Sequence, residues 1–110
     1  MIDAWQAAAE PSRRRLLHLL APGEKSAGEL SEAFESTRSA ISQHLGVLRA
    51  AGLVDVAVSG RRRMYRLNPR GMVRLRAEIT SFWTQELDDL AAEARSTTKG
   101  NVDERNEDVG

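Results

Sequence analysis

Apolar residues recur at helical spacing in four segments of the first 50 residues. The first segment is short, and the second opens at Pro11, where a first-turn proline fits, and runs to about Ala21. The third begins at Ser26, which forms a capping-box pattern with Glu29 three residues later. These patterns predict three helices of modest length before the middle of the chain.

The fourth segment, residues 36 to 50, predicts a helix with two unlike faces. Ile41, Leu45 and Leu48 form an apolar stripe, and Thr37 is the expected N-cap. The opposite face carries small or polar side chains suited to hydrogen bonds with phosphates or base edges: Arg38, Ser39, Ser42 and Gln43. This polar face is the leading candidate for a binding surface.

Two β-prone runs follow the glycine that ends this helix, Gly52. Residues 53 to 58 and 62 to 67 are separated by residues 59 to 61, so the pattern predicts a hairpin. Arg61, Arg62 and Arg63 stand at its tip. Two interpretations of the three arginines are open: an ordinary charged tip, or a site for a polyanion that offsets the repulsion between three adjacent like charges. We favour the second interpretation.

A long final helix should begin at Asn68 and Pro69, which supply a cap and a first-turn proline, and run to about Arg95. At 1.5 Å per residue it would be roughly 40 Å long, so its far half needs a covering surface. We expect a second copy of the chain to supply it, and the alternative is a helix that folds back on its own domain. The expected dimer contacts are Ile2, Trp5, Ile79, Phe82, Trp83, Leu87 and Leu90.

Length and composition favour one small globular domain. The chain has 110 residues, and we place a single domain over residues 1–95 and a disordered acidic tail over residues 96–110. There is no apolar run of membrane-spanning length and no signal-peptide pattern, so we expect a cytoplasmic protein without a membrane partner. With no cysteine, the chain has no disulfide and no thiolate chemistry.

Charge is sorted along the chain although its net value is zero. Residues 1–76 hold 13 Arg or Lys and 7 Asp or Glu, a net charge of +6, and residues 77–110 hold 3 and 9, a net charge of −6. A basic body with an acidic end suggests a polyanionic partner. A solvated surface of uneven composition would give the same counts.

The order of the predicted elements indicates a fold class. A short helix, the two-faced helix and an arginine-bearing hairpin follow each other as in a helix-turn-helix with a wing, a module that binds double-stranded DNA. We therefore expect a mainly α protein with a small β-hairpin, a winged helix-turn-helix in the order α-α-α-α-β-β-α, which dimerises through its first and last helices.

Several short motifs, in their order and spacing, resemble the ArsR-type (ArsR/SmtB) family of bacterial winged-helix repressors. They are residues 11–17, 28–30, 39–45, 48–49, 51–54 and 60–67, and the resemblance covers about two thirds of the chain. It implies a homodimer that binds inverted repeats in promoters and leaves DNA when an effector binds. The family's recognition-helix and wing positions carry over to Ser42 to Leu45 and to Arg61 to Arg63.

The chain departs from the metal sensors of that family. It has no cysteine on the third helix and no histidine on the last one, and His18 and His44 lie on different predicted helices. We expect no metal and no cofactor. His44 lies beside the apolar stripe, so packing and contact with a base both remain open for it. A carboxylate row at Glu86, Asp89 and Glu93 is most simply a solvated face.

These observations lead to one main hypothesis and one alternative. The main hypothesis is a homodimeric, sequence-specific repressor that binds an inverted-repeat operator. Its DNA-binding residues would be Thr37, Arg38, Ser39, Ser42, Gln43, His44, Arg61, Arg62 and Arg63. The alternative is a winged-helix protein-interaction module resembling an antirepressor. An enzyme is not expected, because Ser42 and His44 do not face each other on a helix. The sequence leaves a small-molecule effector unknown.

Overall fold

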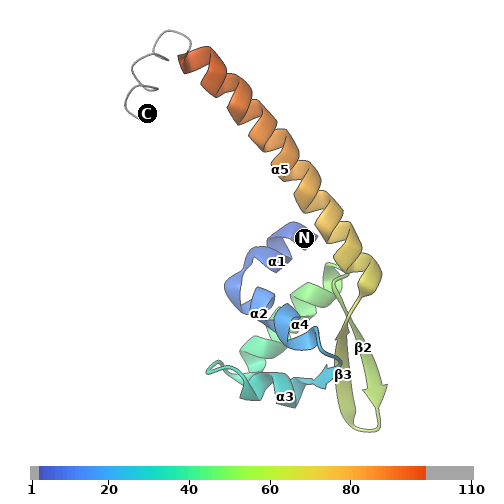
Figure 1. Ribbon diagram of the computed structural model, residues 1–110. Helices are drawn as coiled ribbons and strands as arrows, with labels where there is room; N and C mark the ends of the chain where they lie inside the picture. Colours follow the sequence, from blue (N-terminus) through green and yellow to red (C-terminus); the bar gives the residue numbers. More distant parts are fainter. Residues whose placement is uncertain (1–2, 99–110) are drawn as a thin grey trace. The chain divides into compact units, whose positions relative to one another are not determined.

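The computed structural model describes residues 3–98, which belong to two compact units that divide after Ala77. The first unit holds all the elements except the greater part of the last helix (Figure 1). In chain order the elements are α1 (Ala4–Ala9), α2 (Pro11–Leu20), β1 (Lys25–Ser26), α3 (Ala27–Glu32), α4 (Arg38–Ala50), β2 (Val54–Ser59), β3 (Arg62–Leu67) and α5 (Pro69–Thr98).

The core of the first unit forms where α2, α3 and α4 meet. The large side chains that are almost wholly removed from solvent are Leu16, Leu20, Leu30, Ile41, Leu45, Leu48, Leu53 and Val54. Each contributes about 1.5 to 3 kcal/mol by leaving water. Figure 1 shows these helices gathered together, with the β2–β3 hairpin extending beside them. The helical spacing of the apolar residues therefore predicts the helical part of this core correctly, whereas Leu53 and Val54 come from the predicted β-prone run.

Local capping signals set the ends of the helices where the sequence places them. Pro11 occupies the first turn of α2, and Ser26 and Glu29 form both hydrogen bonds of a capping box at α3. The Thr37 hydroxyl accepts from the backbone N–H of Ala40 at 3.1 Å and caps α4. Gly52 follows α4 with φ +79°, a conformation that glycine adopts without strain.

The sheet has one strand more than the predicted hairpin. Its order is β1-β3-β2, all antiparallel, and β1 joins through the pairs Lys25↔Tyr65 and Ser26↔Met64. The expected order α-α-α-α-β-β-α is therefore corrected by a short strand before α3. A strand of two residues has no periodicity of its own, and it exists only because β3 supplies a partner.

The hairpin otherwise follows its prediction closely. β2 begins and ends one residue later than expected, and β3 has the expected bounds. The pairing ends at Ser59↔Arg62, which leaves a two-residue turn in which Gly60 has φ +64°. Tyr65 is buried on the inner side, as its alternation with the arginines predicts. With α3, α4 and this wing, the winged helix-turn-helix fold class is confirmed.

The beginning of α5 is fastened to the end of α4. Asn68 caps α5 through Oδ1, which accepts from the N–H of Gly71 at 2.7 Å, and its amide nitrogen donates to both Asp55 oxygens at 3.1 Å. The backbone N–H of Asn68 also donates to the carbonyl of Leu53 at 2.9 Å. A Cβ placed on Gly71 would overlap the carbonyl oxygen of Gly52, so the two backbones touch here.

The second unit is described as the continuation of α5 from Glu78. The helix ends at Thr98, three residues beyond the expected end at Arg95. The expected dimer residue Ile2 and residues 99–110 of the expected tail lie outside the described residues. Nowhere in residues 3–98 does a helix have the length and apolar character needed to cross a bilayer.

The contact between Gly52 and Gly71 generates a stability prediction. Gly71→Ala should lower the free energy of unfolding by about 1 to 3 kcal/mol, because backbone must move to admit the methyl group. Gly46→Ala is the matched control: it adds the same methyl to a helix where nothing lies within 4 Å, and it should raise stability by about 0.5 to 1 kcal/mol. Urea unfolding measures both, and equal effects would contradict the close approach.

Candidate nucleic-acid interface

Helix α4 has one face buried in the core and the opposite face exposed to solvent. Ile41, Leu45 and Leu48 each have 0% exposure. All five of the predicted contact residues on the other side are exposed: Thr37, Arg38, Ser39, Ser42 and Gln43. A rigid helix therefore presents a small, polar surface with donors and acceptors free to meet a groove of DNA.

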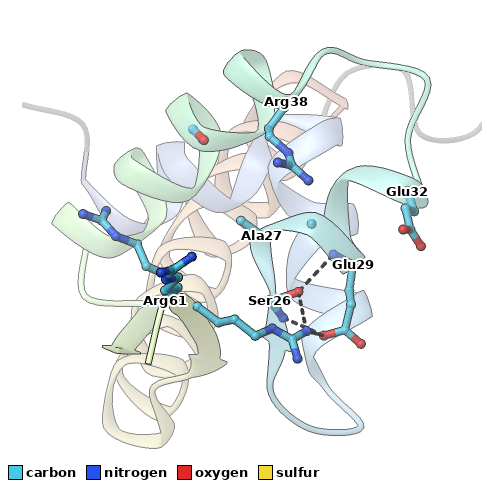
Figure 2. Close-up of a pocket in the computed structure, with 10 residues that line it drawn as sticks. Ser26, Ala27, Glu29, Glu32, Arg38 and Arg61 are labelled. Carbon is cyan, nitrogen blue, oxygen red and sulfur yellow. Dashed lines mark hydrogen bonds and ion pairs between the residues drawn. The ribbon is translucent and has the colours of Figure 1, made fainter. Parts of the chain in front are cut away.

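A cleft of about 500 Å³ lies where the starts of α3 and α4 meet the wing (Figure 2). Its lining residues are Ser26, Ala27, Gly28, Glu29, Glu32, Arg38, Ser42, Arg61, Arg62 and Arg63. Four arginines against two glutamates give the lining a net charge of +2. The structure thus brings together Arg38, Ser42 and the wing arginines, whereas Ser39 and Gln43 lie outside the cleft lining.

The Arg38 side chain reaches across the cleft from α4. Figure 2 shows it extending toward the start of α3, where Ala27 lies. One of its terminal nitrogens is 3.1 Å from the position that a Cβ would take on Gly28. The missing side chain of Gly28 therefore leaves room for this guanidinium group, which places a positive charge between the two helices of the helix-turn-helix.

Arg62 also points at the start of α3, from the wing. Its Nη2 donates to Ser26 Oγ at 3.2 Å and lies 3.5 Å from Glu29 Oε1, while both charged side chains stay largely exposed. Hydrogen bonds from the backbone N–H and the hydroxyl of Ser26 hold the pKa of Glu29 below its ordinary value, and Arg62 lowers it further. Glu29 is thus an ionised partner of a predicted phosphate-binding arginine.

His44 is turned toward α2 rather than toward the open face of α4. Its ring is half-buried, and its Nδ1 lies 3.5 Å from Arg13 Nη1 and 3.9 Å from Glu10 Oε2. The Arg13 side chain also donates through Nε to the carbonyl of Ala7 at 2.8 Å. Of the two roles left open for His44, the geometry favours packing at the inner side of the helix over contact with a base.

Two features of this region escaped sequence reasoning. Arg13 ties the end of α1 to α4, and Glu29 pairs with Arg62 from 33 positions away. The capping-box pattern identifies Glu29 as an N-terminal residue of α3 but says nothing of the wing. Arg13 stands in a run of three arginines, and the sequence does not show which of the three faces inward.

The predicted dimer residues on α5 are mostly exposed. Phe82, Trp83, Leu87 and Leu90 have exposures of 50%, 45%, 56% and 52%, whereas Ile79 and, on α1, Trp5 are half-buried. The rings of Phe82 and Trp83 pack edge to face, with centroids 5.5 Å apart. In residues 3–98 no three His, Cys, Asp or Glu side chains are grouped as metal ligands would be.

Comparison with known protein families gives one clear match. The model of the arsR family of bacterial regulatory proteins matches residues 10–56, which span α2, α3, α4 and the first half of β2. The matched stretch therefore contains the open face of α4 and most of the cleft wall formed by α3. The wing strand β3 and helix α5 lie beyond it.

Individual relatives extend the match over more of the chain. The HTH-type transcriptional regulator Rv2034 of Mycobacterium tuberculosis is 44% identical over 84 residues, which are 76% of this chain and 78% of that protein. The transcriptional repressor SdpR of Bacillus subtilis is 34% identical over 68 residues, 62% of this chain and 76% of that protein. These relatives are named as regulators of transcription, a class of proteins without enzymatic activity.

Solved structures agree with this picture. A crystal structure described as a possible transcriptional regulator for arsenical resistance has 52% sequence identity and a TM-score of 0.75, covering 84% of this chain and 97% of that chain. The structure of HlyU from Vibrio cholerae has 36% identity and a TM-score of 0.57, covering 69% of this chain and 79% of that chain.

The Glu10 carboxylate yields a pH prediction. Burial alone raises its pKa, but hydrogen bonds from the backbone N–H groups of Arg13 and Ser12, with electrostatic attraction to the His44 ring when it is protonated and to Arg13, outweigh burial and hold the pKa below the ordinary value. The lowered pKa means that this carboxylate stabilises the fold at neutral pH, and that the stabilisation is lost as pH falls through the folded-state pKa.

Glu10→Gln should therefore lower the free energy of unfolding near neutral pH by about 0.3 to 1 kcal/mol. The difference from the wild type should shrink as pH falls below the ordinary pKa of a glutamate and then through the lowered folded-state pKa, because the wild-type carboxyl then takes up its proton. Glu24→Gln removes an equal charge from an exposed loop and serves as the control. Urea unfolding over a pH series tests this, and a difference independent of pH would contradict it.

Proposed function

Because this chain belongs to the arsR family of bacterial DNA-binding transcriptional regulators, we propose that it is a homodimeric, sequence-specific repressor that binds an inverted-repeat operator. In this proposal α4 of each subunit enters a major groove, and the wing follows the neighbouring backbone. A bacterial regulator of this kind works in the cytoplasm, where we expect this protein.

One observation carries the proposal. Two residues of the open face of α4, Arg38 and Ser42, line the same positively charged cleft as the wing arginines. A helix and a hairpin that share one basic surface can contact base edges and phosphates of the same duplex at once. If the charged hairpin tip served only solubility, its arginines would not need to lie beside the start of a polar helix.

The contact residues divide by chemistry. Arg38, Ser39, Ser42 and Gln43 lie nearest the bases in this proposal, and Gln43 can pair with an adenine through two hydrogen bonds. Thr37 contacts a phosphate at the amino end of α4. The wing residues Arg61, Arg62 and Arg63 bind phosphates and extend toward a minor groove. His44 supports the helix from within.

The dimer in this proposal forms through α5 and α1. Phe82, Trp83, Leu87 and Leu90 leave about half of their large apolar surfaces exposed in a single chain, and a second copy related by a two-fold axis would cover them. Trp5 and Ile79 join this interface. The two recognition helices would then read half-sites about 34 Å apart, one turn of DNA.

Gln43→Ala separates base reading from phosphate binding. The variant should lose about 1 to 3 kcal/mol of discrimination per half-site, because a pair of hydrogen bonds to a base is lost. Arg62→Ala is the matched comparison, and it should weaken binding to operator and scrambled duplex alike. The measurement is fluorescence anisotropy on a duplex selected from random DNA and on its scrambled form.

The outcome for the wild type in the same assay decides the function. A wild type that binds no palindrome better than scrambled duplex at modest salt would overturn the repressor and favour the protein-interaction module. Unchanged discrimination in Gln43→Ala would instead remove that one residue from base reading and leave the proposed function intact.

Leu87→Asp tests the dimer. A charge placed at this 56% exposed leucine should oppose burial at the interface, so the variant should sediment as a monomer and lose operator affinity. Val58→Asp places the same charge at a 72% exposed valine on the wing strand β2, and its oligomeric state should not change. Analytical ultracentrifugation measures both variants, and a monomeric wild type would refute the proposed interface.

A further inference from the structure

Arg62 already holds a carboxylate in the place where the proposed function requires it to meet phosphate. Its Nη2 is shared between Ser26 Oγ at 3.2 Å and Glu29 Oε1 at 3.5 Å, on the wall of the basic cleft. Four arginines line this cleft, and within residues 3–98 Arg62 is the one that forms an ion pair. The wing is thus partly neutralised before any DNA arrives.

We propose that Glu29 is an internal counter-anion for Arg62, a fixed carboxylate that DNA phosphate must displace when the wing binds. This inference rests on the proposed function and adds a residue that sets the strength of DNA binding. Glu29 acts against binding rather than for it. Its negative charge both occupies Arg62 and faces the approaching phosphates.

The geometry of the pair suits exchange rather than permanent attachment. A strong guanidinium–carboxylate pair has N–O distances of about 2.7 to 2.9 Å and two parallel bonds, whereas Arg62 and Glu29 share one contact at 3.5 Å. The Arg62 and Glu29 side chains are 63% and 50% exposed, so water and salt screen their attraction. A phosphate with shorter, paired hydrogen bonds can therefore replace the carboxylate.

Glu29 stays in place when Arg62 leaves. Its Oε1 accepts from the backbone N–H of Ser26 at 2.9 Å, and its own N–H donates to Ser26 Oγ at 3.1 Å. These capping-box bonds belong to α3 and do not depend on the wing. The carboxylate therefore remains at the cleft wall and recaptures Arg62 when DNA dissociates.

The same capping box makes a clean test available. Glutamine serves at this capping-box position as glutamate does, so Glu29→Gln keeps the hydrogen bond to Ser26 and removes only the charge. Glu32→Gln is the matched control, because Glu32 is an exposed glutamate on α3 that lines the same cleft. In Figure 2 Glu32 lies on the opposite side of the cleft from Arg61.

The experiment compares the wild type, Glu29→Gln, Glu32→Gln, Arg62→Ala and the double variant Glu29→Gln/Arg62→Ala. Anisotropy titrations with operator and scrambled duplex are run over a salt series, and the melting temperature of each variant verifies its fold. Glu29→Gln should bind both duplexes more tightly, by up to about fivefold per subunit, with the gain shrinking as salt rises. Glu32→Gln should show a smaller gain.

The double variant isolates the contribution that passes through Arg62. In the Arg62→Ala background, Glu29→Gln should change affinity no more than Glu32→Gln does. Equal gains for Glu29→Gln and Glu32→Gln, or a full gain without Arg62, would overturn the inference and leave general charge as the cause. Weaker DNA binding by Glu29→Gln would also overturn the inference, because Glu29 would then help binding by positioning Arg62.

Failure of the inference is distinguishable from failure of the proposed function. If the wild type prefers the selected operator over scrambled duplex while Glu29→Gln binds no more tightly, only the counter-anion is lost. If the wild type shows no preference for any duplex, the repressor itself is lost.

Discussion

The burial of one side of α4 is the constraint on which the rest of the site depends. Ile41, Leu45 and Leu48 have no exposed surface, and their fixed positions determine which residues of the same helix face solvent. A rotation of α4 by one residue would place Ser42 in the core and a leucine outside. Hydrophobic packing thus selects the polar surface, although none of the packed residues contacts a ligand.

The arginines of the first unit divide into structural and available groups. Arg13 donates to the end of α1, and Arg15 donates to the carbonyl of Ala33 at 3.0 Å while its guanidinium lies 4.9 Å from the centre of the Phe34 ring. Arg38 and the wing arginines instead line an open cleft. The net charge of +6 in residues 1–76 therefore overstates the positive charge that this part of the molecule offers to a polyanion, and Glu29 reduces that charge further.

Local chemistry accounts for what the sequence could predict. The bounds of α4, the capping box at Ser26 and the proline at the start of α5 depend on neighbours within four positions, so their signals are complete in the sequence. The open face of α4 follows in the same way. All five predicted contact residues on that face are exposed, and His44, which the sequence places beside the apolar stripe, turns inward.

Contacts between residues that are far apart in the chain account for the features that the sequence could not predict. The strand β1 forms only against β3, and the contacts of Arg13 with His44 and of Arg62 with Glu29 join positions more than 30 residues apart. No residue pattern marks such pairs. The backbone contact of Gly52 with Gly71 is of the same kind, and it has a mechanical meaning. No side chain separates the two main chains, so the first turn of α5 cannot come closer to the residues that follow α4 without overlap of backbone atoms.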